Sequence, residues 1–306
     1  MCVVFMGTPD VAVPALRALL ESPHDVAAVV TQPDKPRGRG RGVSASPVKD
    51  LAEEHGLPIL QPASPKEEGF ADALSVFEPN ALAVVAYGHI LPTSVLSVAP
   101  AMNAHFSLLP AYRGAAPVQR ALMDGATETG VSVFMLEPTV DTGPVVAVER
   151  VEVGPQETAG ELLDRLAPIG ARLLVGAIDE LERGALEPIP QGEIDASPAP
   201  KLKPEEAEID WKRSAGELAN LVRALNPRPG AFTTAGGKRL IVWRARAVEG
   251  SGPSGTVLSA APGLVVATGR GGLSLDEVQL EGKRPMPIEE FVRGRRFEAG
   301  RPLAGA

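Results

Sequence analysis

The chain has 306 residues, of which 44% are hydrophobic and 22% are charged, and its formal net charge is −8. This composition excludes a wholly disordered chain, and the length is sufficient for two domains. Averaged over the whole chain, the acidic charge argues against a nucleic-acid partner.

No membrane-crossing or disulfide-linked segment is expected. The apolar runs are far shorter than the ~18 residues that a membrane span needs, and the first residues lack the basic stretch of a signal peptide. The single cysteine, Cys2, cannot form an internal disulfide, and no group of Cys and His residues has the spacing of a zinc site. We therefore expect a cytoplasmic protein that binds no metal and no membrane. Separately from these arguments, we expect a monomer.

Residues 1–183 alternate short apolar runs with amphipathic stretches, which predicts βα units and a mostly parallel, Rossmann-like α/β sheet. The expected strands are 2–6, 26–31, 58–61, 82–86 and 102–106, followed by an edge hairpin of 131–136 and 145–153. The expected helices are 11–20, 47–55, 66–77, 116–124 and 158–183. Ser46 is placed to cap the helix that Pro47 opens, and Pro168 predicts a kink or break near Ala167.

The remainder of the chain differs in composition. Residues 184–208 carry five prolines and little periodicity, which predicts a linker. Residues 209–306 contain an expected helix at 215–224 and several short apolar runs separated by glycine-rich turns. The last two of these runs are 273–275 and 277–280. The pattern predicts a small OB-like β-barrel domain.

Charge is distributed unevenly between these parts. Residues 1–208 hold 15 Lys and Arg against 29 Asp and Glu, a net charge of −14, whereas residues 209–306 hold 15 against 9, a net charge of +6. Such asymmetry indicates a basic module attached to an acidic one, and basic modules often bind phosphate backbones. The alternative is that the charge serves solubility alone.

The fold class invites a dinucleotide cofactor, but the turn after the first strand argues against it. This turn, Gly7-Thr8-Pro9-Asp10, has one glycine where the phosphate-binding fingerprint needs three. A Gly-x-Gly cluster occurs only later, at 38–42, with arginines between the glycines. We therefore expect no nicotinamide cofactor.

The segment 103–110 carries the clearest chemical signal. Asn103 and His105 are two residues apart on an expected strand, so their side chains project from one face near the carboxyl end, where α/β sheets bind ligands. An amide beside an imidazole suits the stabilisation of an oxyanion that develops on a carbonyl. The alternative is a buried polar pair that forms local hydrogen bonds.

Three neighbouring features favour the functional interpretation. Asp141 lies in a turn-rich loop after another strand, where a carboxylate can orient the imidazole. Residues 107–110 form an apolar lip after the strand of His105, followed by the basic turn 112–114. The loop 86–92 gives the adjacent strand a second apolar wall, suited to a flat heterocycle.

At this point an ordered set of motifs resembles the folate-dependent formyltransferases, and among them those that act on methionyl-tRNA. The central motif is Asn103-x-His105-x-Ser107-Leu108-Leu109-Pro110, followed by Asp141-Thr142-Gly143. The other matching motifs are Gly7-Thr8-Pro9-Asp10, Thr31-Gln32-Pro33-Asp34, Ser46-Pro47-Val48-Lys49, Arg113-Gly114-Ala115-Ala116-Pro117 and Ile209-Asp210-Trp211. They occur in order from about residue 3 into the C-terminal domain.

The resemblance implies transfer of a formyl group from 10-formyltetrahydrofolate to the α-amino group of methionine on initiator tRNA, without a metal. It implies that Asn103 and His105 stabilise the oxyanion, and that Asp141 orients His105 and takes up the amine proton. The folate-binding residues it implies are Ser107, Leu108, Leu109, Pro110, Ile90, Leu91 and Val140. Residues 1–183 are then the catalytic domain, 184–208 the linker and 209–306 the tRNA-binding domain.

A basic segment follows the second expected strand. Its cations, spaced by Gly and Pro, are Lys35, Arg37, Arg39 and Arg41. On composition alone, a solvated surface loop is an equally good interpretation. The resemblance implies that this segment contacts the acceptor stem of the tRNA.

Other functions remain open on the sequence alone. The same chemistry serves a formyltransferase whose acceptor is an amino-sugar nucleotide, or a hydrolase that transfers the formyl group to water. The basic segment argues against both, because a small acceptor does not need it. A non-catalytic tRNA-binding protein is a third possibility, against which the intact set of Asn103, His105 and Asp141 argues.

Overall fold

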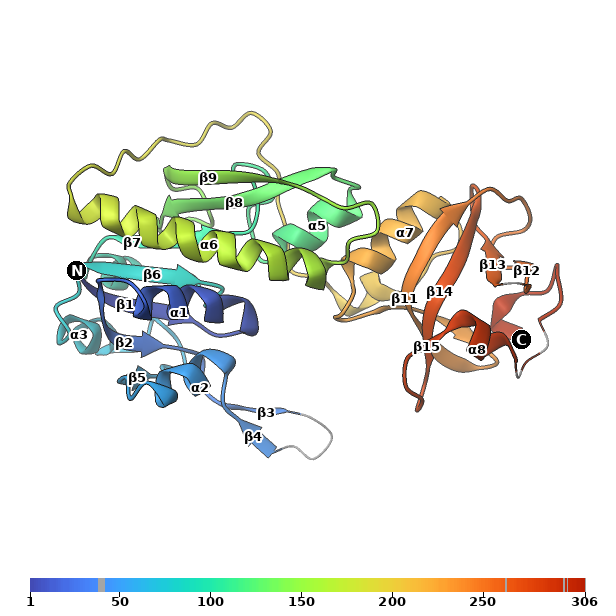
Figure 1. Cartoon of the computed structure of the whole chain (residues 1–306), viewed down its shortest axis with the longest axis horizontal. Coiled ribbons are helices and arrows are strands. Elements are labelled where there is room, and N and C mark those ends of the chain that lie inside the picture. The colour runs from blue at the N-terminus through green and yellow to red at the C-terminus, as the bar shows by residue number, and fades with distance from the viewer. Residues whose placement is uncertain (38–41, 262, 294, 296, 306) are drawn as a thin grey trace. The chain divides into compact units, whose positions relative to one another are not determined.

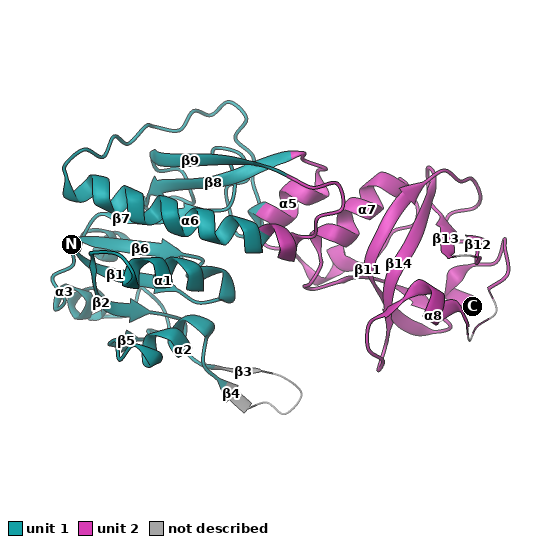
Figure 2. Cartoon of the chain, viewed as in Figure 1, with its two compact units in different colours: residues 1–117, 128–152, 163–200 teal, residues 118–127, 153–162, 201–306 magenta. Residues whose placement is uncertain are grey.

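The computed structural model describes residues 1–37, 42–261, 263–293, 295 and 297–305, with the side chains of 35–37, 42 and 43 left out. The described chain forms two compact units (Figure 2). Unit 1 comprises residues 1–117, 128–152 and 163–200, and unit 2 comprises 118–127, 153–162 and the chain from 201 onward. None of the described helices combines the length and apolar character that crossing a membrane requires.

Unit 1 is built on a seven-stranded sheet with the order β5-β2-β1-β6-β7-β8-β9 (Figure 1). The strands are β1 (Cys2–Gly7), β2 (Asp25–Val30), β5 (Ile59–Leu60), β6 (Ala81–Val85), β7 (Ala101–His105), β8 (Glu128–Met135) and β9 (Val145–Glu152). The first five in this order pair in parallel, and β8 and β9 pair antiparallel at one edge. The predicted parallel sheet with an edge hairpin is confirmed.

The burial of each strand agrees with its central or edge position in this sheet. Every residue of β6 and all but the first of β1 are buried, as expected for central parallel strands covered on both faces. In β9, by contrast, buried positions are absent and exposed ones alternate with half-buried ones, which is typical of an edge strand.

The helices in the first 182 residues are the five expected ones and a short one that was not expected, Thr93–Leu96. They are α1 (Val13–Leu20), α2 (Pro47–Glu54), α3 (Phe70–Ser75), α4 (Thr93–Leu96), α5 (Pro117–Met123) and α6 (Ala159–Glu182). The predicted cap of α2 is confirmed, because the Ser46 side chain accepts a hydrogen bond from the N–H of Lys49. The predicted break at Pro168 does not occur, and α6 runs through it. Fully buried residues such as Leu166 and Leu174 supply packing that offsets the missing hydrogen bond.

A short antiparallel hairpin, β3 (Lys35–Arg37) and β4 (Gly42–Ser44), occurs in the segment that the sequence suggested was a loop. The residues on either side of the hairpin, 31–34 and 45–46, which we call its root, are held by hydrogen bonds. Thr31, after β2, shares a 2.7 Å hydrogen bond with Ser46, which precedes α2. Asp34, at the start of the hairpin, accepts a 2.6 Å hydrogen bond from Lys49 of α2.

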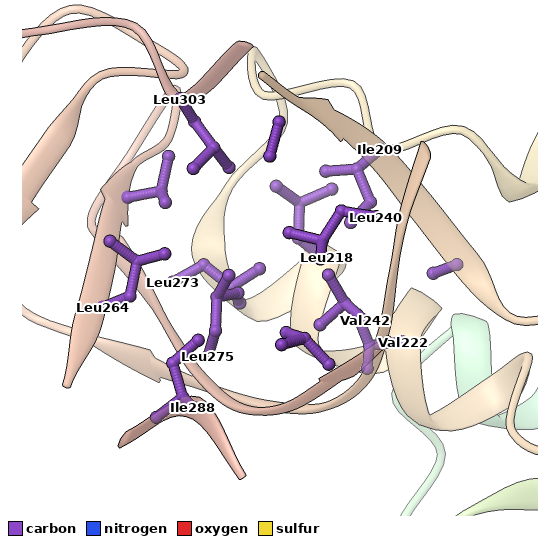
Figure 3. Close-up of a cluster of buried hydrophobic side chains, with 14 of the residues drawn as sticks. Ile209, Leu218, Val222, Leu240, Val242, Leu264, Leu273, Leu275, Ile288 and Leu303 are labelled. Atoms are coloured by element: carbon purple, nitrogen blue, oxygen red, sulfur yellow. The ribbon is translucent and has the colours of Figure 1, made fainter. Parts of the chain in front are cut away.

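Unit 2 contains an antiparallel sheet with the order β10-β11-β14-β13-β12, and β15 pairs with β14. The elements are α7 (Ala215–Ala224), β10 (Ala231–Ala235), β11 (Lys238–Val248), β12 (Val257–Ser259), β13 (Leu264–Ala267), β14 (Gly272–Leu280), β15 (Met286–Pro287) and α8 (Ile288–Arg293). The sheet curls around a core in which Leu218, Leu240, Leu273 and Ile288 point toward one another (Figure 3). The predicted second domain, small and rich in antiparallel strands, is confirmed.

The two runs expected at 273–275 and 277–280 are one strand, β14. Its buried residues are Leu273 and Leu275, then Val278 and Leu280, so the alternation changes phase once. The pairing with β11 shifts register at the same place, around Arg244. This irregularity keeps both halves of β14 facing the core, which a strictly alternating pattern cannot do.

Candidate functional site

A cavity of about 500 Å³ lies at the carboxyl ends of β6 and β7 in unit 1. Asn103, His105 and Asp141 all line it, although Asp141 is distant in sequence. The surrounding wall is largely apolar and includes Val84, Ile90, Leu91, Leu136 and Val140. The volume is in the range of ligand-binding sites, and few polar groups converge on it.

Strand β7 positions the first two polar groups. Asn103 and His105 are two residues apart on β7, which is paired with β6 on one side and β8 on the other. Their side chains therefore leave the sheet on the same face. Among the described residues, the Asn103 carboxamide has no hydrogen-bond partner, which leaves its N–H groups available to a ligand in the cavity.

The protonation of His105 is set by its surroundings. The residue is 5% exposed, and burial lowers the pKa of its imidazole, an effect that the Asp141 carboxylate and the Tyr112 carbonyl oppose. Its Nε2 atom lies 2.9 Å from the Tyr112 carbonyl oxygen, which can only accept a hydrogen bond. Nε2 therefore carries the proton of the neutral ring, and Nδ1 is the nitrogen nearest Asp141.

Asp141 is held on the loop between β8 and β9. Its Oδ2 atom accepts a 2.7 Å hydrogen bond from the backbone N–H of Gly114 and lies 3.7 Å from Nδ1 of His105. The second distance is too long for a hydrogen bond but short enough for a strong charge interaction. Asp141 has a φ angle of +51°, a left-handed conformation that Asp tolerates better than most residues.

The expected apolar lip, 107–110, is not part of the cavity wall, whereas Ile90, Leu91 and Val140 are. Ser107 is fully buried and donates a 2.6 Å hydrogen bond to the Ala111 carbonyl. Ser132 of β8 accepts from the N–H of Leu109 and donates to the Ser107 carbonyl. In this structure the segment shapes the loop that leads to Tyr112. The folate role of Ser107, Leu108, Leu109 and Pro110 stays a prediction.

Two residues of the site escaped the sequence analysis as individual contributors. The backbone N–H of Gly114 donates a hydrogen bond to Asp141. Gly114 has a φ angle of +131°, and a Cβ at this position would lie 2.5 Å from the Ala199 carbonyl oxygen. Tyr87 lines the cavity, and its hydroxyl is buried without a hydrogen-bond partner among the described residues. Burial raises the pKa of that hydroxyl to about 12, so it is a neutral donor. Both lie in loops beside expected strand ends, which is the signal that could have indicated them.

The basic segment is only partly described. Lys35 and Arg37 lie on β3, without described side chains, and Arg39 and Arg41 lie outside the described residues. The root of the hairpin is well connected, because Gln61 also donates a 2.8 Å hydrogen bond to Asp34. The hydrogen bond with Lys49 is the main cause that lowers the pKa of the Asp34 carboxyl and raises that of Lys49.

A second cavity, of about 390 Å³, lies in unit 2 between α7 and β11. Three arginines, Arg223, Arg244 and Arg246, are among the residues that line it. Arg244 is paired with Glu161 and Arg246 with Asp276, so part of this positive charge is neutralised within the unit.

A separate polar cluster lies where β1 and β2 begin, at the opposite end of these strands from the site. His24 is 3.1 Å from Asp179, and with Glu182 these residues could hold a metal ion. The amino group of Met1 is 3.1 Å from Glu182 and 3.2 Å from Nδ1 of His24, so it already pairs with one of the two carboxylates. An ion-pair network accounts for this cluster.

Comparisons with known proteins cover almost the whole chain. The family model described as "Formyl transferase" matches residues 1–178, and that described as "Formyl transferase, C-terminal domain" matches residues 201–296. A methionyl-tRNA formyltransferase from Lachnospira eligens is 42% identical, covering 98% of both proteins. One from Parafrankia sp. is 48% identical, covering 97% of both.

Solved structures support the same fold at lower identity. HypX from Aquifex aeolicus, in complex with tetrahydrofolic acid, matches 97% of this chain and 48% of its own with a TM-score of 0.66 and 19% identity. A methionyl-tRNA formyltransferase from Clostridium thermocellum matches 80% of this chain and 92% of its own with a TM-score of 0.58 and 20% identity.

Proposed function

The chain belongs to the formyl transferase family, and we propose that it transfers the formyl group of 10-formyltetrahydrofolate to the α-amino group of methionine on initiator tRNA. The observation that carries the proposal is the convergence of Asn103, His105 and Asp141 on one cavity with apolar walls. The product is a formylmethionyl-tRNA for the start of translation.

The cavity fits a folate donor. Ile90, Leu91 and Val140 offer apolar surface for a flat ring system, and the buried Tyr87 hydroxyl lacks a described partner. The donor supplies the formyl carbon and a nitrogen leaving group. The polar residues that line the cavity orient the substrates and donate hydrogen bonds, rather than acting as a covalent nucleophile.

The first step is addition of the amine to the formyl carbon. An α-amino group has a pKa near ~8, so a useful fraction is neutral at pH 7. As the carbon–nitrogen bond forms, the electron pair of the carbonyl moves onto oxygen. Asn103 donates a hydrogen bond to this oxyanion, a contribution typically worth about 3–4 kcal/mol.

His105 acts through Nδ1, because Tyr112 engages Nε2. When Nδ1 has taken up a second proton from solvent, it donates to the oxyanion, and the Asp141 carboxylate 3.7 Å away stabilises that protonated form. The proton returns to solvent when the carbonyl re-forms. The neutral resting state and the nearby carboxylate thus allow His105 to gain charge only as negative charge develops.

Asp141 completes the reaction as the proton carrier. It takes the proton of the attacking amine, directly or through water, and returns a proton to the nitrogen that leaves. The bond between that nitrogen and the formyl carbon then breaks, the oxyanion becomes a carbonyl again, and the formamide and tetrahydrofolate separate.

The acceptor side of the proposal uses the basic residues. Residues 1–183 form the catalytic domain, and Lys35, Arg37, Arg39 and Arg41 bind tRNA phosphates together with the basic domain 209–306. The segment 184–208 joins them. We propose a cytoplasmic monomer that requires no metal.

The test is an acceptor assay with the purified chain and 10-formyltetrahydrofolate. With methionyl initiator tRNA, mass spectrometry should detect formylmethionine after the ester is cleaved. Methionyl elongator tRNA, uncharged tRNA and an amino-sugar nucleotide serve as parallel acceptors. Formylation of the sugar, or release of formate in every tube at equal rate, would contradict the proposed acceptor. Binding of tRNA without turnover would leave only a tRNA-binding function.

A further inference from the structure

Residues 189–199, which we call the strap, run beside the loop that carries Asp141 and the loop that follows β7. At one end, Ile189 and Val145 of β9 exchange two backbone hydrogen bonds of 2.8 Å. At the other end, the N–H of Arg113 donates to the Ser197 carbonyl at 2.8 Å, and the N–H of Ala199 donates to the Arg113 carbonyl at 2.6 Å. The strap therefore belongs to unit 1 structurally, although its composition is that of a linker.

One strap side chain, Gln191, connects the two loops. Its Oε1 atom accepts hydrogen bonds from Nε and Nη2 of Arg113 at 3.1 and 3.0 Å. Its Nε2 atom donates to the carbonyl oxygens of Asp141 at 3.0 Å and Gly143 at 2.7 Å. Arginine can only donate and backbone carbonyls can only accept, so the orientation of this amide is determined by its partners.

These bonds act on the backbone that carries the catalytic carboxylate. The two carbonyls that Gln191 holds belong to Asp141 itself and to Gly143, two residues later, and the left-handed backbone of Asp141 needs support from its surroundings. On the other side, Arg113 precedes Gly114, which donates to the Asp141 side chain. The same strap also reaches the loop after β7, because the Ser197 hydroxyl accepts a 3.0 Å hydrogen bond from the N–H of Tyr112, whose carbonyl binds His105.

We infer that Gln191 is a positioning residue for the transfer reaction: it fixes the Asp141 turn against the Arg113–Gly114 turn and so sets the distance between Asp141 and His105. This inference rests on the proposed function. Gln191 does not line the cavity, so its substitution should alter turnover rather than substrate binding. Misplacement of a catalytic group by about 1 Å can reduce turnover by about 100-fold.

The sharpest variant is Gln191→Glu. It keeps the shape of the side chain and the acceptor for Arg113, but a carboxylate cannot donate to the two loop carbonyls. Gln191→Ala removes both sets of bonds. Glu193→Gln is the matched control, because Glu193 is 83% exposed at its side chain and touches Arg113 only at 3.4 Å.

For both Gln191 variants we expect kcat to fall 10- to 100-fold, with KM for tRNA and for the folate donor within twofold of wild type. Glu193→Gln should retain full activity. In an Asp141→Asn background, Gln191→Ala should change kcat less than twofold, because its effect passes through Asp141. An unchanged kcat in Gln191→Glu, or the same fold-loss in both backgrounds, overturns the inference.

A second readout separates this inference from the proposed function. If wild type formylates no acceptor, the proposed function fails, while an NMR titration of the His105 ring still tests the strap. Moving the carboxylate away removes a stabilising charge, so Gln191→Ala should lower the pKa of His105 in the direction that Asp141→Asn does. The double variant should lower it no further. A pKa that Gln191→Ala leaves unchanged contradicts the positioning role.

Discussion

The backbone N–H of Gly114 donates a 2.7 Å hydrogen bond to Oδ2 of Asp141, which joins two loops that follow different strands of the sheet. The Gly114 backbone adopts φ +131° and passes so close to the strap that a Cβ would lie 2.5 Å from the Ala199 carbonyl oxygen. Only glycine satisfies both conditions.

Gly114→Ala should therefore lower both stability and turnover. The forced backbone shift costs about 1–3 kcal/mol and moves the donor away from Asp141, so we expect kcat to fall at least tenfold. Gly56→Ala is the control, since Gly56 has φ +65° with nothing within 4 Å of an added Cβ. It should lose stability in urea unfolding while keeping its kcat. Equal kcat values for the two variants would argue against a role for Gly114 in the site.

Asp141→Asn tests the proton carrier directly. Asn tolerates the left-handed backbone and can still accept from Gly114, so the loop should keep its shape. Loss of the acid–base group should reduce kcat by about 100- to 10,000-fold, while the affinity for tRNA stays within twofold. Asp195→Asn, at an exposed position with φ +64°, is the matched control and should behave as wild type. Near-normal turnover of Asp141→Asn in steady-state assays would refute the assigned role.

The lowered pKa of His105 predicts how stability depends on pH. The unfolded chain binds a proton at this residue near pH 6.5, whereas the folded chain binds it only at lower pH, because the ring is buried. Between these values the unfolded state holds more protons, so the free energy of unfolding falls as the pH drops below about 6.5. Urea unfolding between pH 5 and 7.5 should show a larger loss for wild type than for His105→Gln. Parallel curves for the two proteins would contradict the prediction.

Much of unit 1 could be predicted from the sequence because its strands are short apolar runs with both faces covered. Asn103 and His105 were recognisable from their spacing on one strand, and Asp141 from its position in a loop after another. The hydrogen bonds that hold them were not recognisable. Gln191 and Ser197 act through hydrogen bonds to backbone groups, which leave no apolar periodicity, so the composition of their segment predicts only a linker.

Local irregularities caused the other differences. The alternation of buried and exposed residues along β14 changes phase once, opposite a register shift in β11. Strict alternation therefore predicts two short strands where the structure has one. The hairpin of β3 and β4 is three residues on each side and contains Pro and Gly, so it carries no strand signal. In the lip 107–110, Leu108 packs near Gly130 of β8, and none of the four residues lines the cavity.

Lys49→Met tests whether the root of the hairpin supports tRNA binding. Loss of the Lys49 hydrogen bond should raise the pKa of Asp34 toward its ordinary value and loosen the connection between Asp34 and α2. We expect weaker tRNA binding by several-fold, with kcat at saturating tRNA unchanged, because the cavity does not include these residues. The control is Lys66→Met, which removes one exposed charge from the same unit. Binding titrations in which both variants weaken equally would assign the effect to net charge.

The salt dependence of binding tests the basic segment itself. Each arginine that neutralises a phosphate releases counterions. Arg39→Gln combined with Arg41→Gln should therefore weaken tRNA binding. The slope of log affinity against log salt concentration should become less steep by about one for each phosphate that is no longer neutralised. Arg150→Gln combined with Arg172→Gln makes the same change in net charge at exposed arginines of unit 1. That control should leave the slope near its wild-type value, because both arginines lie outside the basic segment and are already paired with Glu128 and Glu149. If both double variants have the same slope, Arg39 and Arg41 neutralise no phosphate.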